Sequence, residues 1–260
     1  MGYNAAVQLL DRHGDHLGGG VLLTSYLVVT ANHCVSRMNI GDSLPLLVGG
    51  VAAQGTLVER AADHDLALLE IDRPLRPIEP KYARRGDAWF GPIRRSLSDP
   101  ELAGTVRNRV EYECQSGGRL MAVQLTTDVD IGEYRGYSGG PVLKLPDEDP
   151  SVLGILLEQL PDGGSIQRNT STLFAACISE AFRLLHALST AWLIFRLLDL
   201  RPGDVQSAQE TTTRKYNDGE ETVFDVAVET LSSSMIDADS HLILRARVSE
   251  TAVESYGGGE

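Results

Sequence analysis

Hydrophobic residues between residue 3 and about residue 175 fall into short runs of strand length, separated by Gly, Pro and Asp. Most runs are rich in Val and Leu, and no helical periodicity lies between them. Strands at this spacing predict an all-β fold, a barrel or a sandwich. The runs are AAVQLLD (5–11), GGVLLTSYLVVTA (19–31), LPLLVGG (44–50), GTLVERAA (55–62), LALLEID (66–72), MAVQLTTD (121–128), GPVLKL (140–145) and SVLGILLEQL (151–160).

The hydrophobic pattern changes to a helical one at about residue 178. In ISEAFRLLHALSTAWLIFRLLDL (178–200), large apolar residues recur at helical spacing and Ser179 is a candidate N-cap. Charged residues such as Arg196 and Asp199 interrupt the apolar run, which argues against a membrane span. We therefore expect a helix that packs on the β domain, so that residues 1–200 form one domain.

Residues 201–260 form an acidic extension, with 12 Asp or Glu against 5 Lys or Arg. Two strands are predicted in it, ETVFDVAVETL (221–231) and HLILRARV (241–248), the first with clear alternation. The extension is therefore a small β module, an added hairpin or a segment that orders on a partner. The pattern does not choose among these.

Charge and cysteine content narrow the classes of partner. The 260 residues carry a formal net charge of −13, which argues against nucleic acid and anionic membrane as partners. Three cysteines, Cys34, Cys114 and Cys177, are widely spaced with no CxxC pair, so we expect no metal site, no cofactor and no disulfide framework. The start of the chain lacks the features of a secretory signal. A cytoplasmic location is the expectation.

Three segments carry residues for nucleophilic catalysis. VVTANHCV brings a strand to His33, DHDLALLEID opens a strand after Asp65, and RGYSGGPV surrounds Ser138 with glycine. A serine hydroxyl needs an imidazole to take its proton, and the imidazole needs a carboxylate to orient it. The reaction also needs two N–H donors for the developing oxyanion, which Gly136 and Ser138 can supply. The glycines permit close backbone approach around the hydroxyl.

The segments TANHC, DLALL and GYSGGP resemble, in the same order, the three signatures of the chymotrypsin or trypsin-like serine peptidases. The resemblance covers roughly residues 3 to 185. It implies two perpendicular six-stranded β-barrels with the site in the cleft between them, and a closing C-terminal helix. It also implies His33 as general base, Asp65 as its orienting carboxylate, Ser138 as nucleophile, and Gly136 and Ser138 as the oxyanion hole. Asp63 is the rival carboxylate.

Two departures from the family favour its intracellular bacterial, HtrA-like members. Tyr137 stands where trypsin has the acid that pairs with a new N-terminus. The loop 130–137 is therefore ordered directly or by a partner. Cys34 matches a cysteine that in secreted relatives pairs with one at the place of Gly18, so a free thiol is expected here.

The sequence indicates the residues of the specificity pocket less clearly than those of the triad. The position of trypsin's pocket aspartate is Gly132, while Asp130, Glu133 and Glu158 lie near the expected pocket walls. These carboxylates indicate a slight preference for a basic residue at P1, although each could equally face solvent.

The other histidines are interpreted as structural or exposed. His64 lies between two aspartates, and a solvated loop residue is the preferred interpretation over a metal ligand. The remaining ones, outside the three signatures, are His13, His16, His186 and His241.

The predicted function is a serine endopeptidase of restricted specificity that acts through an acyl-enzyme on protein or peptide substrates. Family context suggests a bacterial stress or defence assembly and a regulatory protein partner. The alternative is a catalytically silent trypsin-like scaffold that binds proteins. A GxSxG acyl hydrolase is disfavoured because its nucleophile precedes the histidine in the chain.

Overall fold

The computed structural model describes residues 5–93, 101–128, 134, 136–145, 150–159 and 172–189, and three strands further on, at 211–217, 220–226 and 248–253. The chain divides into two units, residues 1–188 and 189–260. The expected boundary after residue 200 falls outside the described residues, so it stays a prediction.

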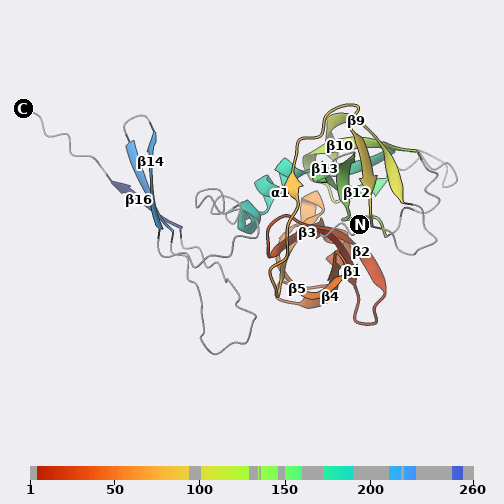
Figure 1. The fold of residues 1–260 in the computed structure, drawn as a ribbon, viewed down its shortest axis with the longest axis horizontal. Helices are drawn as coiled ribbons and strands as arrows, with labels where there is room; N and C mark the ends of the chain where they lie inside the picture. Colours follow the sequence, from red (N-terminus) through yellow and green to blue (C-terminus); the bar gives the residue numbers. More distant parts are fainter. Residues whose placement is uncertain are drawn as a thin grey trace, which may run out of the picture. The chain divides into compact units, whose positions relative to one another are not determined.

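The first barrel is closed and antiparallel, in the order β1-β2-β3-β6-β5-β4 (Figure 1). Along β1 the buried Val7 and Leu9 alternate with half-exposed neighbours, as a strand with one face on the core requires. Every position of β2 from Gly18 onward is buried. In addition to its pairing within the first barrel, this segment contacts the second barrel, since the Gly19 N–H donates to the Ser138 carbonyl. The strands are β1 (Ala6–Leu10), β2 (His16–Leu22), β3 (Leu27–Ala31), β4 (Ser43–Val48), β5 (Val51–Ala61) and β6 (Leu66–Ile71).

The second barrel runs β11-β8-β9-β10-β13-β12 and closes where β12 pairs with β11. Its core contains fully buried Trp89, Leu102 and Leu125. A short β7 (Glu79–Pro80) adds to β12 in parallel. The predicted pair of six-stranded barrels is confirmed. The strands are β8 (Ala88–Gly91), β9 (Leu102–Glu113), β10 (Arg119–Thr127), β11 (Pro141–Leu145), β12 (Ser151–Gln159) and β13 (Thr172–Cys177).

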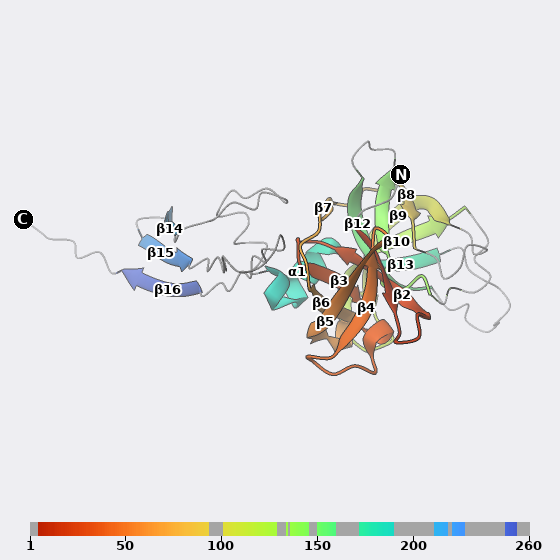
Figure 2. The ribbon, with the colours of Figure 1, turned by 60° about the horizontal axis from the view of Figure 1, so that its bottom comes forward.

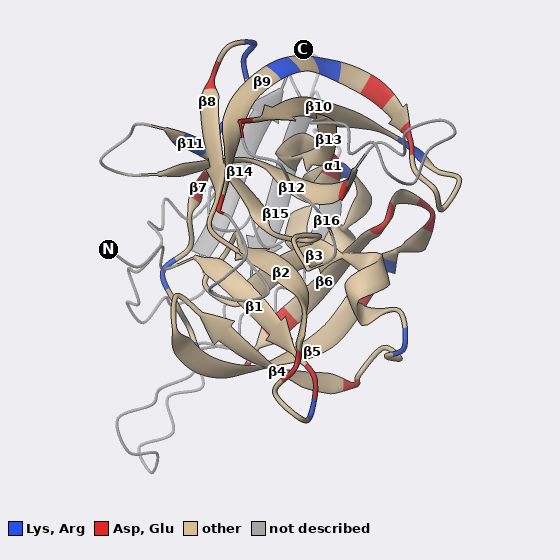
Figure 3. Ribbon diagram, turned by 90° about the vertical axis from the view of Figure 1, so that its right-hand side faces the viewer, with Lys and Arg blue, Asp and Glu red and all other residues tan. Residues whose placement is uncertain are grey.

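Three of these strands, β8, β9 and β13, fall where no strand was predicted individually. Exposed positions of β9 carry Arg107, Arg109 and Glu111, and the strand crosses the top of Figure 3 as a band of basic and then acidic residues. Because the charged residues leave few apolar positions, the segment has a weak hydrophobic pattern.

The predicted helix begins with α1 (Ile178–Leu184), and the chain is helical again at 186–189. The N-cap is Cys177 and no side chain caps the helix, so the expected cap at Ser179 is wrong. The Glu59 carboxylate of β5 accepts hydrogen bonds from the N–H groups of His186 (2.8 Å) and Ala187 (3.0 Å), which ties this segment to the first barrel. Residues 190–200 of the prediction lie outside the described residues. No helix within the described ranges is long and apolar enough to cross a membrane.

The C-terminal unit contains an antiparallel sheet in the order β14-β15-β16 (Figure 2). Strand β15 (Glu220–Val226) covers the first half of the strand predicted at 221–231. Strand β16 (Val248–Val253) begins at the last residue of the second prediction, whose other residues lie outside the described part. The polar strand β14 (Thr211–Asn217) was not predicted.

Candidate active site

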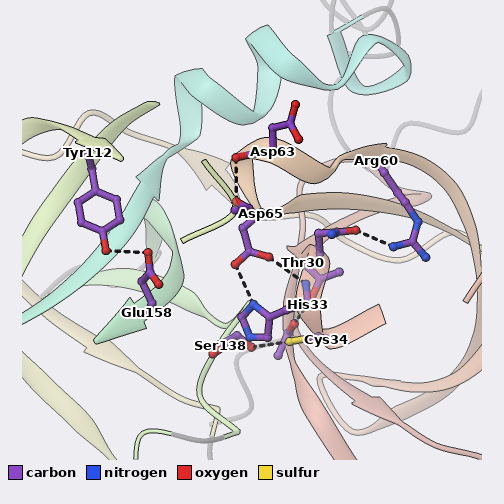
Figure 4. A network of polar contacts seen from close by, with 12 residues as sticks. Thr30, His33, Cys34, Arg60, Asp63, Asp65, Tyr112, Ser138 and Glu158 are labelled. Atoms are coloured by element: carbon purple, nitrogen blue, oxygen red, sulfur yellow. Dashed lines mark hydrogen bonds and ion pairs between the residues drawn. The ribbon is translucent and has the colours of Figure 1, made fainter. Parts of the chain in front are cut away.

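His33 and Asp65 follow two paired strands of the first barrel. His33 lies on the 3-10 turn η1 (Asn32–Val35) after β3, and Asp65 follows the turn η2 (Ala62–His64) before β6. Because Ala31 pairs with Leu66, the register brings both residues to the same end of the barrel. His33 Nδ1 lies 2.7 Å from Asp65 Oδ2, and the His33 backbone N–H donates to Asp65 Oδ1 at 2.9 Å (Figure 4). One carboxylate thus holds both the ring and the backbone of the histidine.

Asp65 adopts an unusual backbone conformation. Its φ of 53° is the only positive φ of a non-glycine residue in the described part of the chain. The turn before it is held from the second barrel, since the Asp63 carbonyl accepts from the Gly118 N–H and the Ser116 hydroxyl, both at 2.7 Å. A Cβ at Gly118 would collide with that carbonyl. Asp65 therefore carries the contact to His33, and the rival Asp63 serves through its backbone.

The electrostatics of His33 follow from this contact. The hydrogen bond to Asp65, and to a lesser degree the neighbouring Cys34, raises the pKa of His33 above its ordinary value. The His33 side chain is 51% exposed while that of Asp65 is 16% exposed. The ring is therefore open to a substrate on one side and anchored by a shielded carboxylate on the other.

Ser138 lies on a tight loop that enters β11. In the view of Figure 4, Ser138 is drawn below the His33 ring and Asp65 above it. The Ser138 carbonyl accepts from the Gly19 N–H of β2 at 2.7 Å, and the Gly139 N–H donates to the Leu156 carbonyl of β12 at 2.6 Å. The loop is thus held between the two barrels.

The glycines around Ser138 are explained by this packing. Gly139 has a φ of 79°, and a Cβ there would lie 2.5 Å from the Thr30 hydroxyl and would collide with the Gly19 carbonyl. A Cβ at Gly19 would lie 2.6 Å from the Gly140 Cα. Two backbones pass each other too closely for side chains, which agrees with the close approach expected from the sequence.

The two N–H groups predicted for the oxyanion hole belong to Gly136 and Ser138. Neither has a hydrogen-bond acceptor among the residues that the structure describes. Gly136 has a φ of 96°, and its carbonyl lies 2.8 Å from His16 Nε2. His16 was interpreted as structural or exposed; it is half-buried and contacts the loop of the nucleophile directly.

Tyr137 occupies the position at which trypsin has the acid that pairs with the new N-terminus, and it makes apolar contacts there. The residue is 2% exposed, belongs to the core of the second barrel and stacks against Tyr134 at 6.1 Å between ring centroids. Burial raises the pKa of Tyr134 above its ordinary value. The loop is therefore anchored in part by aromatic packing on the barrel core.

Cys34 is a free thiol, as expected, and so are Cys114 and Cys177. Its Sγ lies 3.6 Å from the Ser138 carbonyl. A Cβ at Gly18 would lie 2.5 Å from that Sγ, so Gly18 occupies the place that the resemblance assigned to a cysteine partner.

Glu158 is the one predicted pocket residue in the described part of the chain; Asp130, Gly132 and Glu133 lie outside it. It is half-buried on β12, two residues after Leu156, whose carbonyl accepts from the Gly139 N–H of the Ser138 loop. The Tyr112 hydroxyl donates to Glu158 Oε1 at 2.6 Å (Figure 4). Burial and, secondarily, Glu158 raise the pKa of Tyr112.

Arg60 was not identified from the sequence. Its guanidinium donates to Asn32 Oδ1 at 2.7 Å, to the Val35 carbonyl at 2.8 Å and to the Met38 carbonyl. It therefore fixes both ends of the turn that carries His33. Most of these partners are backbone carbonyls, so no sequence pattern marks the residue.

His64 belongs to η2, and within the described ranges no group of His, Cys, Asp and Glu could hold a metal ion. His13 is exposed beside Arg12, and the His186 backbone is held by Glu59. His241 lies outside the described residues.

Residues 18–155 match the family described as the trypsin-like peptidase domain. Among solved structures, the Rv3671c protease of M. tuberculosis in its inactive form is similar at a TM-score of 0.53 and 19% identity, over 71% of this chain and 88% of that one. The apo MamO protease domain of Magnetospirillum magneticum is similar at 0.54 and 16%, over 70% and 96%. A variant of the HtrA-type protease AlgW with a tripeptide is similar at 0.54 and 18%, over 71% and 59%. At these identities the likeness concerns the fold.

Proposed function

Because this chain belongs to the family of trypsin-like peptidases, and is thereby a serine endopeptidase, we propose that Ser138, His33 and Asp65 carry out its peptide hydrolysis. The carrying observation is the double contact of one carboxylate, that of Asp65, with the ring and the backbone of His33 (Figure 4).

In the proposed reaction, His33 acts first as a general base and then as a general acid. Ser138 Oγ attacks the scissile carbonyl while His33 Nε2 takes the hydroxyl proton, and Asp65 stabilises the resulting imidazolium. The N–H groups of Gly136 and Ser138 bind the oxyanion. His33 then gives its proton to the leaving amine, so that the C–N bond breaks and an acyl-enzyme remains. Water, deprotonated by His33, attacks the acyl carbon and releases the acid and Ser138.

The restricted specificity that we propose includes a slight preference for a basic residue at P1. Its support is the half-buried Glu158 carboxylate, which lies along β12 two residues after Leu156, whose carbonyl accepts from the loop of Ser138. Tyr112 engages one oxygen of this carboxylate. A carboxylate held in place by a phenol is a suitable partner for a cationic side chain.

We also propose a cytoplasmic protein that works with a regulatory partner in a bacterial stress or defence assembly. The free thiol of Cys34 supports a reducing compartment, and the acidic second unit supports a docking or sensing role. Comparing the full chain with a chain ended after Asp199 tests this role. Equal turnover, with and without cell extract, would remove the second unit from the account.

Labelling with a fluorophosphonate tests the catalytic proposal. We expect the full chain to label at Ser138 and to cleave a peptide library, and Ser138→Ala to do neither. Labelling only after a partner is added would show that the loop around Tyr137 is ordered by that partner. No labelling under any of these conditions would contradict the proposal and favour the protein-binding scaffold.

A further inference from the structure

One strand of the first barrel holds both ends of the segment that supplies the two oxyanion donors. His16, the first residue of β2, lies with Nε2 2.8 Å from the Gly136 carbonyl. Three residues later the Gly19 N–H donates to the Ser138 carbonyl at 2.7 Å. The carbonyls of Gly136 and Ser138, two residues apart, are thus fixed by two groups of the same strand.

The Gly136 contact indicates which ring nitrogen of His16 acts as the donor. A carbonyl oxygen only accepts hydrogen bonds, so His16 Nε2 carries the proton in this contact. The Ser138 carbonyl is held by a backbone group, the N–H of Gly19. The Gly136 carbonyl is held by a side chain, the imidazole of His16.

Gly136 needs such a restraint because it is glycine. Its φ of 96° lies in a region that glycine enters freely, and glycine leaves that region equally freely. Its N–H and its carbonyl belong to adjacent peptide planes that share the Gly136 Cα. With the carbonyl plane tethered, only rotations within Gly136 itself can turn the N–H away from the oxyanion.

His16 is itself well placed to act as a tether. The turn that precedes it is closed by Asp11, whose carboxylate accepts from the N–H groups of His13 (2.7 Å) and Asp15 (2.9 Å). His16 then pairs with Leu10 in the β1–β2 ladder. The ring therefore projects from a backbone that is held on both sides.

We propose that His16 is a positioning residue, which holds the Gly136 N–H where the oxyanion forms. The inference rests on the proposed function, because it assigns His16 a part in that same site. A donor that is held in advance stabilises the transition state more than the bound substrate. Loss of the tether should therefore reduce kcat and leave KM nearly unchanged.

The test compares His16→Ala with His16→Gln, whose side-chain amide retains a donor, and with His13→Ala as the matched control in the same turn. We measure kcat and KM on a cleaved peptide, and the inhibition constant of a peptide aldehyde, which forms a tetrahedral adduct. We expect His16→Ala to lower kcat about 10- to 100-fold and to weaken the aldehyde by a similar factor. KM should stay within about threefold, His16→Gln should recover most of the loss, and His13→Ala should match the unmodified chain.

Several results would overturn the inference: an unchanged kcat in His16→Ala, a loss confined to KM, or equal losses in His16→Ala and His16→Gln. If His16→Ala fails to fold, His16→Leu replaces it, since leucine fills the volume without a donor. An unmodified chain that cleaves and labels while His16→Ala is unimpaired contradicts this inference alone. A full chain that never labels contradicts the proposed function as well.

Discussion

The two halves of the site are held in different ways. On the first barrel, His33 is fixed by Asp65 and Arg60, which belong to the same barrel. On the second barrel, the Ser138 loop is also bonded to the first barrel, through His16 and Gly19. The direct contacts of His33 therefore lie within the first barrel, with one brace from the second barrel at the Asp63 carbonyl, whereas the loop of Ser138 is bonded directly to both barrels.

This difference has a consequence for regulation. A partner or a change of conditions that loosens the contact between the barrels would act on the Ser138 loop directly, and on the His33–Asp65 pair only through the turn at Asp63. Local elements with few contacts of their own open at lower free energy than the elements around them. The second-barrel half is thus the natural point of control.

The largest effect is expected from Asp65→Asn, which removes the negative charge beside the His33 ring. Activity requires neutral His33, so it rises with pH through the pKa of His33, and Asp65 raises that pKa. We expect kcat/KM to fall about 10³-fold or more, because the amide no longer stabilises the imidazolium. The remaining activity should rise at a lower pH than in the unmodified chain. A pH profile of kcat/KM measures both, and a rise that moves to higher pH would contradict the account.

The next largest effect is expected from Arg60→Met, which removes support from the turn that carries His33 and leaves Ser138, His33 and Asp65 unchanged. It removes the hydrogen bonds that hold η1, at a cost of about 2–4 kcal/mol in the free energy of unfolding. We expect kcat/KM to fall about tenfold, with fluorophosphonate labelling slowed to a similar degree. The exposed Arg73→Met is the control. Unfolding by urea and labelling rates give the answer, and equal stability of the two variants would refute a role for Arg60.

Gly18→Cys would add a covalent link within the first barrel only, between β2 and the turn that carries His33. A disulfide to Cys34 closes a loop within the first barrel, which should add about 2–3 kcal/mol to stability under oxidising conditions. The added Cβ lies 2.9 Å from the Ser138 carbonyl, so a small loss of kcat is expected. Thermal melts with and without reductant, and thiol counting, measure the outcome. Thiols that stay reduced in mild oxidant would show that the geometry of Gly18 and Cys34 is wrong.

The smallest effect concerns specificity, on the second barrel. Glu158→Gln keeps the shape of the side chain and removes its charge, so cleavage after Lys or Arg should fall a few-fold relative to cleavage after uncharged residues. Glu101→Gln, on another part of the barrel, is the control. A cleavage profile that is the same in both variants would remove Glu158 from the specificity pocket.

The sequence predicted strands with apolar inner positions, such as β1 and β6. It also predicted Ser138, His33 and Asp65 as a triad, and the contact between His33 and Asp65 agrees with that prediction, which an activity assay has to test. It did not predict β9, where Arg107 and Arg109 occupy outward positions. The support of the site was also missed. Arg60 and His16 act on backbone carbonyls, and carbonyls are the same at every position of the chain. Only the folded register shows which carbonyl a donor reaches.

The central claim is that Ser138, His33 and Asp65 act as one unit, and a double-mutant comparison tests it most directly. Peptide cleavage is measured for Ser138→Ala, for His33→Ala and for the double variant. Residues of one unit give non-additive losses, so the double variant should be no slower than the slower single variant. Losses that multiply in the double variant would contradict the account.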